Sequence, residues 1–165
     1  MLFGLKRVRV FYALLPVVSN KLASRFFTMP VIDPRLKRQL DGSGLVYEVS
    51  SHYLRGVLGF TNGRSQVFLI DPTTDSVGDH EDHDILSPIA DLVTYEVRVR
   101  SKAYELLKFA GTQRLGQMSI VGTTLVYKAD CSVDCSPEAF RSVVETVCLL
   151  ADKLEKALTK GEDKF

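Results

Sequence analysis

The chain has 165 residues, of which 45% are hydrophobic and 25% are charged, and its formal net charge is +1. This length and composition are ordinary for one soluble globular domain. Residues 1–32 contain no acidic residue and five of the 21 basic ones, which leaves 16 basic against 20 acidic residues in the remainder. A body with this net negative charge has no bulk attraction for nucleic acid, so we expect no nucleic-acid partner.

Residues 1–29 form a basic, hydrophobic extension. Its apolar run from Val10 to Val18 is interrupted by Pro16, and it is much shorter than the ~20 apolar residues that a membrane-spanning helix needs. Three interpretations stay open: a start site placed too early, with Met29 as the true start; a targeting segment; or an amphipathic arm. We assign a single domain to residues 30–159 and a short tail to residues 160–165.

The domain begins with a predicted short helix followed by strands. Asp33 and Pro34 suit the cap and the first turn of a helix, and Gly42 suits its exit. The apolar patterns over residues 45–51 and 53–60 then predict two strands.

A hairpin and a further strand are expected next. Asn62 and Gly63 form a strong signal for a tight turn, after which residues 64–71 return as an antiparallel strand. The string "ILSPIADL" over residues 85–92 predicts another strand, in which Pro88 requires an edge position or a bulge.

A helix is predicted over most of residues 93–110, although residues 94–100 also alternate as a strand would. The helical spacing is carried by Val93, Val97, Tyr104, Leu107 and Ala110. Residues 116–130 then predict a second hairpin that turns near Gly122.

A long amphipathic helix is predicted to end the domain. Ser136 suits its cap and Pro137 its first position. Apolar residues then recur at alternating steps of four and three, namely Phe140, Val144, Val147, Ala151, Leu154 and Leu158. The expected fold is therefore α+β, an antiparallel sheet covered by helices, in the order α-β-β-β-β-α-β-β-α.

The acidic segment "GDHEDHD" before residue 85 offers candidate metal ligands. His80 and His83 could bind a metal with the help of Glu81, Asp82 and Asp84. A real site also needs a ligand from a distant part of the chain and outer groups that orient it. We therefore interpret the segment as a solvated loop, predict no metal and no cofactor, and keep a metal-dependent enzyme as an alternative.

The three cysteines do not suggest catalysis. An odd count, Cys131, Cys135 and Cys148, fits a reducing compartment such as the cytoplasm. Cys131 and Cys135 are spaced more widely than the pairs of redox motifs and zinc knuckles, so we interpret them as structural thiols. Cys135 precedes the expected last helix, but a catalytic thiol would need a histidine partner that the sequence does not indicate. We predict no catalytic residue.

Three strings resemble the YbjN-like family, whose fold is that of type III secretion chaperones. They are "GRSQVFLI" over residues 63–70, "ILSPIADL" over residues 85–92, and residues 115–158. The resemblance implies a non-enzymatic, homodimeric protein-binding module, since chaperones of this fold hold extended segments of a client protein. It implies no catalytic residues. The basic extension and the net positive charge depart from the acidic pattern of those chaperones.

The expected function is therefore that of a cytoplasmic interaction module, chaperone-like or regulatory, that binds a protein client or regulator. Candidate contact residues are Arg64, Gln66, Val143 and Leu150. Each has an alternative structural role: the first two could simply begin a strand, and the last two could widen a helix face that packs on its own sheet. A membrane-peripheral factor anchored by residues 1–29 is the remaining alternative.

Overall fold

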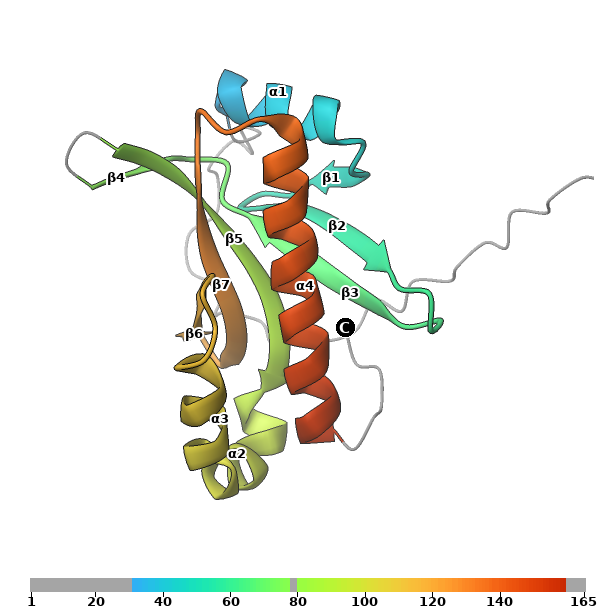
Figure 1. The fold of residues 1–165 in the computed structure, drawn as a ribbon, viewed down its shortest axis with the longest axis vertical. Helices are drawn as coiled ribbons and strands as arrows, with labels where there is room; N and C mark the ends of the chain where they lie inside the picture. The colour runs from blue at the N-terminus through green and yellow to red at the C-terminus, as the bar shows by residue number, and fades with distance from the viewer. Residues whose placement is uncertain (1–30, 78–79, 160–165) are drawn as a thin grey trace, which may run out of the picture.

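A computed structural model describes residues 31–77 and 80–159 and shows an α+β fold (Figure 1). One antiparallel sheet forms the centre, a long helix crosses one of its faces, and shorter helices lie at the two ends of the molecule. The described elements, in chain order, are α1 (Pro34–Ser43), β1 (Tyr47–Val49), β2 (Leu54–Gly59), β3 (Ser65–Ile70), β4 (Asp75–Val77), β5 (His80–Asp91), α2 (Leu92–Ser101), α3 (Ala103–Ala110), β6 (Gln117–Val121), β7 (Thr124–Ser132) and α4 (Pro137–Thr159).

The strands are arranged in the order β1-β2-β3-β5-β7-β6, and β4 pairs with β5 off this path. All pairings are antiparallel. The strands β1 and β6 are consequently the two ends of the main path, and β5 and β7 lie near its centre.

The predicted order of elements is confirmed, with two additions. A short strand, β4, precedes β5, and the single helix predicted over residues 93–110 is divided into α2 and α3 at Lys102. The break is slight, because the amide of Lys102 still bonds to the carbonyl of Arg98 at 3.1 Å and the amide of Leu106 bonds to Lys102 O at 2.9 Å.

Both predicted hairpins form. The β2–β3 turn places Gly63 at a φ of 81°, and the β6–β7 turn places Gly122 at a φ of 60°. Glycine adopts these left-handed conformations without the steric cost that a Cβ imposes. The sequence signals at these two positions therefore reflect the backbone geometry of the turns.

The core lies between one face of the sheet and the helices α1 and α4. All six residues of the predicted stripe on α4 are buried, from Phe140 to Leu158. They meet inward-facing strand residues such as Phe68, Ile85 and Tyr127. Close packing extends to the backbone at Gly56, where a Cβ would collide with the Phe68 ring.

Both predicted helix starts are capped as expected. The Asp33 carboxylate accepts a bond from the amide of Arg35 at 2.7 Å, and the Ser136 hydroxyl accepts one from the amide of Ala139 at 3.2 Å. Each cap satisfies an amide that has no partner within its helix.

Pro88 lies in β5, an inner strand of the sheet rather than an edge strand, at a point where the pairing is irregular as a bulge would require. The pairing of β5 with β7 shifts register between Pro88 and Ala90. The side chain of Gln66 donates to the carbonyl of Pro88 at 2.5 Å. The irregular part of the strand thus obtains a hydrogen bond from a buried side chain.

The prediction of a solvated loop over residues 80–84 is wrong, because these residues form the first part of β5. On one side they pair with β4, and on the other side they pair with residues 130–132 of β7. Two of the negative charges are balanced by cations from other elements: Glu81 pairs with Arg35, and Asp84 pairs with Lys128 at 2.6 Å. Pairing on both sides outweighs the weak strand propensity of acidic residues.

Within residues 31–77 and 80–159, no helix combines the length and apolar character needed to cross a membrane. The predicted extension over residues 1–29 and the tail over residues 160–165 lie outside the described residues.

Candidate functional site

The two histidines of the acidic segment do not converge. Residues three apart on a strand point to opposite faces of the sheet, and His80 is exposed whereas His83 is completely buried. Among the residues that the structure describes, no cluster of histidine, cysteine, aspartate and glutamate is arranged to hold a metal ion. The geometry therefore gives no support to the metal-dependent enzyme.

His83 faces the core beneath α1 rather than solvent. Its Nδ1 lies 3.4 Å from the carbonyl of Thr73, and its Nε2 has no hydrogen-bond partner among the described residues. Burial lowers the pKa of His83 below its ordinary value, and the contact with Thr73 opposes this only in part. The imidazole is therefore a neutral group inside the fold near neutral pH.

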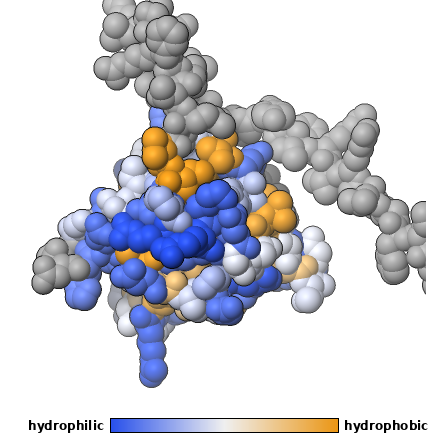
Figure 2. Space-filling model, turned by 90° about the horizontal axis from the view of Figure 1, so that it is seen from above, coloured by the Kyte–Doolittle hydropathy of each residue, from blue (hydrophilic) through white to orange (hydrophobic). Residues whose placement is uncertain are grey.

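Charged residues cover the end of the molecule above His83. Arg35 bridges the carboxylates of Asp33 and Glu81, and its hydrogen bond lowers the pKa of Asp33 to about 2. Figure 2 looks onto this end from above and shows a band of hydrophilic residues across it. Arg35 thus links the start of α1 to β5 at this end of the sheet.

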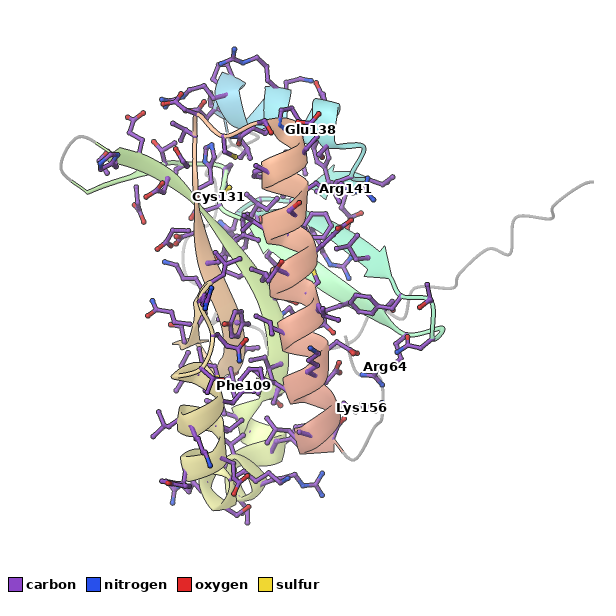
Figure 3. All side chains as sticks on the ribbon, in the orientation of Figure 1. Arg64, Phe109, Cys131, Glu138, Arg141 and Lys156 are labelled. Carbon is purple, nitrogen blue, oxygen red and sulfur yellow. The ribbon has the colours of Figure 1, made fainter. Side chains whose placement is uncertain are left out.

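Arg64 and Gln66, both predicted to contact a partner, are instead engaged within the chain. The guanidinium of Arg64 lies 2.6 Å from Asp152 and 3.2 Å from Glu155, and its side chain is only 13% exposed. Figure 3 shows Arg64 at the turn end of the β2–β3 hairpin, beside the C-terminal half of α4. Gln66 is completely buried. The two residues fasten the hairpin to α4 and β5 rather than forming an open polar patch.

Val143 and Leu150 also face the interior. Leu150 is 8% exposed and belongs to the core, and Val143 is half-buried against it. This placement agrees with the other role considered for them, in which they widen the face of α4 that packs on its own sheet.

The helices α2 and α3 carry large apolar side chains that are exposed, and none of these was predicted from the sequence as a contact residue. Val93 and Val97 of α2 are 76% and 83% exposed, and Tyr104 and Leu107 of α3 are 76% and 70% exposed. We call these four residues the α2–α3 surface. A shallow depression on α2, with Val97 and Arg98 in its lining, lies in the same region.

The opposite side of α2 and α3 is apolar as well and rests on the domain. Leu106 is buried, and Tyr95, Val99 and Phe109 pack partly buried against the core. Arg98 fastens α2 by donating to the carbonyl of Leu158 in the last turn of α4. No residue of α2 is buried, so this helix is held to the chain along one side only.

The strand β6 adds an edge at the same end of the molecule (Figure 1). Among the described strands, β6 pairs only with β7, and its residues Ile120 and Val121 are 61% and 42% exposed. An edge strand of this kind offers backbone donors and acceptors to an added strand.

The sequence did contain signals for the features that were missed. Asp152 and Glu155 lie beside the apolar stripe of the last helix, and a buried carboxylate requires a cation or hydrogen-bond donors. The apolar positions over residues 92–110 cover more than one side of a helix, which requires either deep burial or a second contact.

In comparisons with known proteins, no protein-family model matches this chain, and no curated protein matches it in sequence.

Proposed function

We propose that this chain is a non-enzymatic protein-interaction module, chaperone-like or regulatory, that binds a protein partner through the α2–α3 surface. The observation that carries the proposal is that α2 and α3 are apolar on two sides, whereas the domain covers one. A helix of a globular domain normally turns one apolar face to the core and a polar face to solvent. A contiguous exposed apolar patch on a folded domain is characteristic of an interaction site.

The size of the surface is appropriate for the anchor of an interface. Complete burial of one such side chain is worth about 1.5–3 kcal/mol. The four side chains are 70–83% exposed, so covering them contributes roughly 4–9 kcal/mol. This is similar to the lower range of association costs, and further contacts are therefore required. Exposed charged residues of α2 and α3 are placed to supply them.

The partner we propose for the α2–α3 surface is a second copy of this chain. Charges of both signs lie beside this surface: Glu96 pairs with Arg100 within the helix at 2.6 Å, and Glu105 and Lys108 are exposed on α3. A two-fold interface presents the same patch twice, so each copy can pair its acidic groups with the basic groups of the other. The edge of β6 would then remain available to an extended client segment, which would add a strand to the sheet. This assembly is in keeping with the YbjN-like resemblance.

Sedimentation velocity of the purified full chain tests the proposal. We expect a dimer, and we expect Val97→Glu to shift it to a monomer because a charge would be buried in the interface. Val46→Glu is the matched control, since Val46 is also a valine, is 84% exposed and lies between α1 and β1. Circular dichroism checks that both variants fold. A monomeric parent chain, or equal loss of the dimer in both variants, would refute a two-fold interface at this surface.

A further inference from the structure

Two thiols lie next to each other where β7 connects to α4. The Sγ atoms of Cys131 and Cys135 are 3.3 Å apart. Figure 3 shows Cys131 in the upper part of the sheet, below α1. A disulfide has an S–S distance of about 2.05 Å, so the sulfurs need to approach by a little over 1 Å.

The connection that carries these thiols is held in place from α1. The side-chain amide of Gln39 lies 3.0 Å from the carbonyls of both Ser132 and Val133 and 3.3 Å from the Sγ of Cys135. The amide of Cys135 also bonds to the carbonyl of Ser132 at 3.2 Å. The proximity of the sulfurs is therefore a consequence of a fixed backbone.

The two thiols differ in their access to solvent. Cys131 is 4% exposed, whereas Cys135 is half-buried. Burial raises the pKa of Cys131 well above that of an ordinary thiol, and the neighbouring Cys135 raises it further. A small oxidant therefore meets Cys135 first, and Cys131 is available only from within the fold.

A buried histidine lies on the same face of the sheet as Cys131. His83 is directly opposite Cys131 in the pairing of β5 with β7. Opposed residues of neighbouring strands have Cβ atoms about 4.5–5.5 Å apart. The Nε2 of His83 has no hydrogen-bond partner among the described residues, although the side chain is completely buried. His83 is thus a buried neighbour of Cys131 on this face, although no hydrogen bond joins the two side chains.

We propose that Cys131 and Cys135 form a site of reversible two-electron oxidation by hydroperoxides. The sulfur of Cys135 attacks the outer oxygen of the peroxide, the O–O bond breaks, and water or an alcohol leaves, which gives Cys135 sulfenic acid. The sulfur of Cys131 then attacks that of Cys135, the S–O bond breaks, and the thiol proton of Cys131 passes to the departing hydroxide, which leaves as water. Two thiols and one peroxide thus give one disulfide, with the peroxide as the oxidant. The disulfide joins the end of β7 to the start of α4.

Peptide mapping of the full chain after exposure to hydrogen peroxide tests this site. Trypsin cleavage gives a peptide 129–141 that contains Cys131 and Cys135, and a peptide 142–153 that contains the third cysteine, Cys148. We expect peptide 129–141 to lose two hydrogens and to resist alkylation until dithiothreitol is added. Cys148 is buried, so peptide 142–153 should remain fully alkylated and serves as the internal control.

Two variants separate the roles of the thiols. Cys131→Ser should accumulate a sulfenic acid on Cys135, which dimedone traps. Cys135→Ser should leave Cys131 reduced, because the peroxide no longer meets an accessible thiol. The proposal is overturned if peptide 129–141 of the parent chain keeps two alkylatable thiols, if Cys148 oxidises at the same rate, or if Cys135→Ser oxidises at Cys131 as fast as the parent chain does.

Discussion

Replacement of Arg64 by methionine removes the cation that lies between two carboxylates of α4. Methionine keeps most of the length and apolar volume of the side chain, so the change is mainly one of charge. Arg64 is 88 residues away from Asp152 in sequence, and the side chains of Asp152 and Glu155 are 9% and 0% exposed. The variant therefore leaves carboxylates in the interior without this partner.

The expected loss can be worked from the geometry. At an effective dielectric constant of about 20, contacts of 2.6 and 3.2 Å correspond to roughly 5–6 kcal/mol each. Much of this is offset by the cost of desolvating the charges. Removing one partner of a buried pair typically costs about 3–5 kcal/mol, because the remaining charge stays buried. At roughly 2–4 °C per kcal/mol, Arg64→Met should lower the Tm by about 6–20 °C.

Thermal unfolding followed by circular dichroism measures this effect. The control is Arg55→Met, because Arg55 pairs with Glu48 at 3.0 Å across a much more exposed contact. Exposed pairs contribute at most about 1 kcal/mol. The double variant Arg64→Met, Glu155→Gln should recover part of the loss, since it also removes a buried charge. A loss in Arg64→Met no larger than that in Arg55→Met would refute the reasoning.

Gly56→Ala should lower the unfolding free energy by about 1–3 kcal/mol, because the new Cβ collides with the Phe68 ring. Gly59→Ala in the same strand is the control, since its new Cβ meets nothing within 4 Å and should change the unfolding free energy little. Thermal melts compare the two variants, and equal melting temperatures would contradict the close packing at Gly56. Burial lowers the pKa of His83, so the unfolded chain binds the additional proton. Stability is therefore fully present above a pH of 6.5, the ordinary pKa of histidine, and falls as the pH drops toward the folded pKa of His83. His83→Gln should lose this part of the pH dependence in unfolding titrations and His80→Gln should keep it; the opposite result would place the responsible group elsewhere.

The long helix and the hairpins could be predicted because their signals are local. The stripe from Phe140 to Leu158 has one period over the whole helix, and it is buried as that period requires. Gly63 and Gly122 mark turns whose positive φ angles follow from the backbone at those residues. In each case the residues that form the sequence signal are the same residues that form the helix or the turn.

The strand over residues 80–84 could not be predicted, because its stability is supplied by distant residues. Acidic side chains and histidine have low strand propensity, and the local sequence resembles a solvated loop. The cations that balance it, Arg35 and Lys128, are far away in sequence. Pairing with β7 then places His83 in the core.

The candidate contact residues illustrate the same difficulty. Arg64 and Gln66 are polar and follow a turn, which is typical of a surface position, yet α4 and β5 cover them. Conversely, Val97 and Leu107 follow helical spacing, which is usually a sign of burial, yet they are exposed. Amphipathic spacing identifies a face, but only the packed fold determines what covers that face.

Native mass spectrometry of the complex captured gently from its own cells tests the interaction module most directly. The parent chain, Val97→Glu and Val46→Glu are compared under the same conditions. We predict a dimer, alone or with a reproducible protein partner, for the parent chain and for Val46→Glu, and a loss of that assembly for Val97→Glu. A bare monomer from the parent chain, or an assembly that Val97→Glu leaves intact, would contradict an interaction role for the α2–α3 surface.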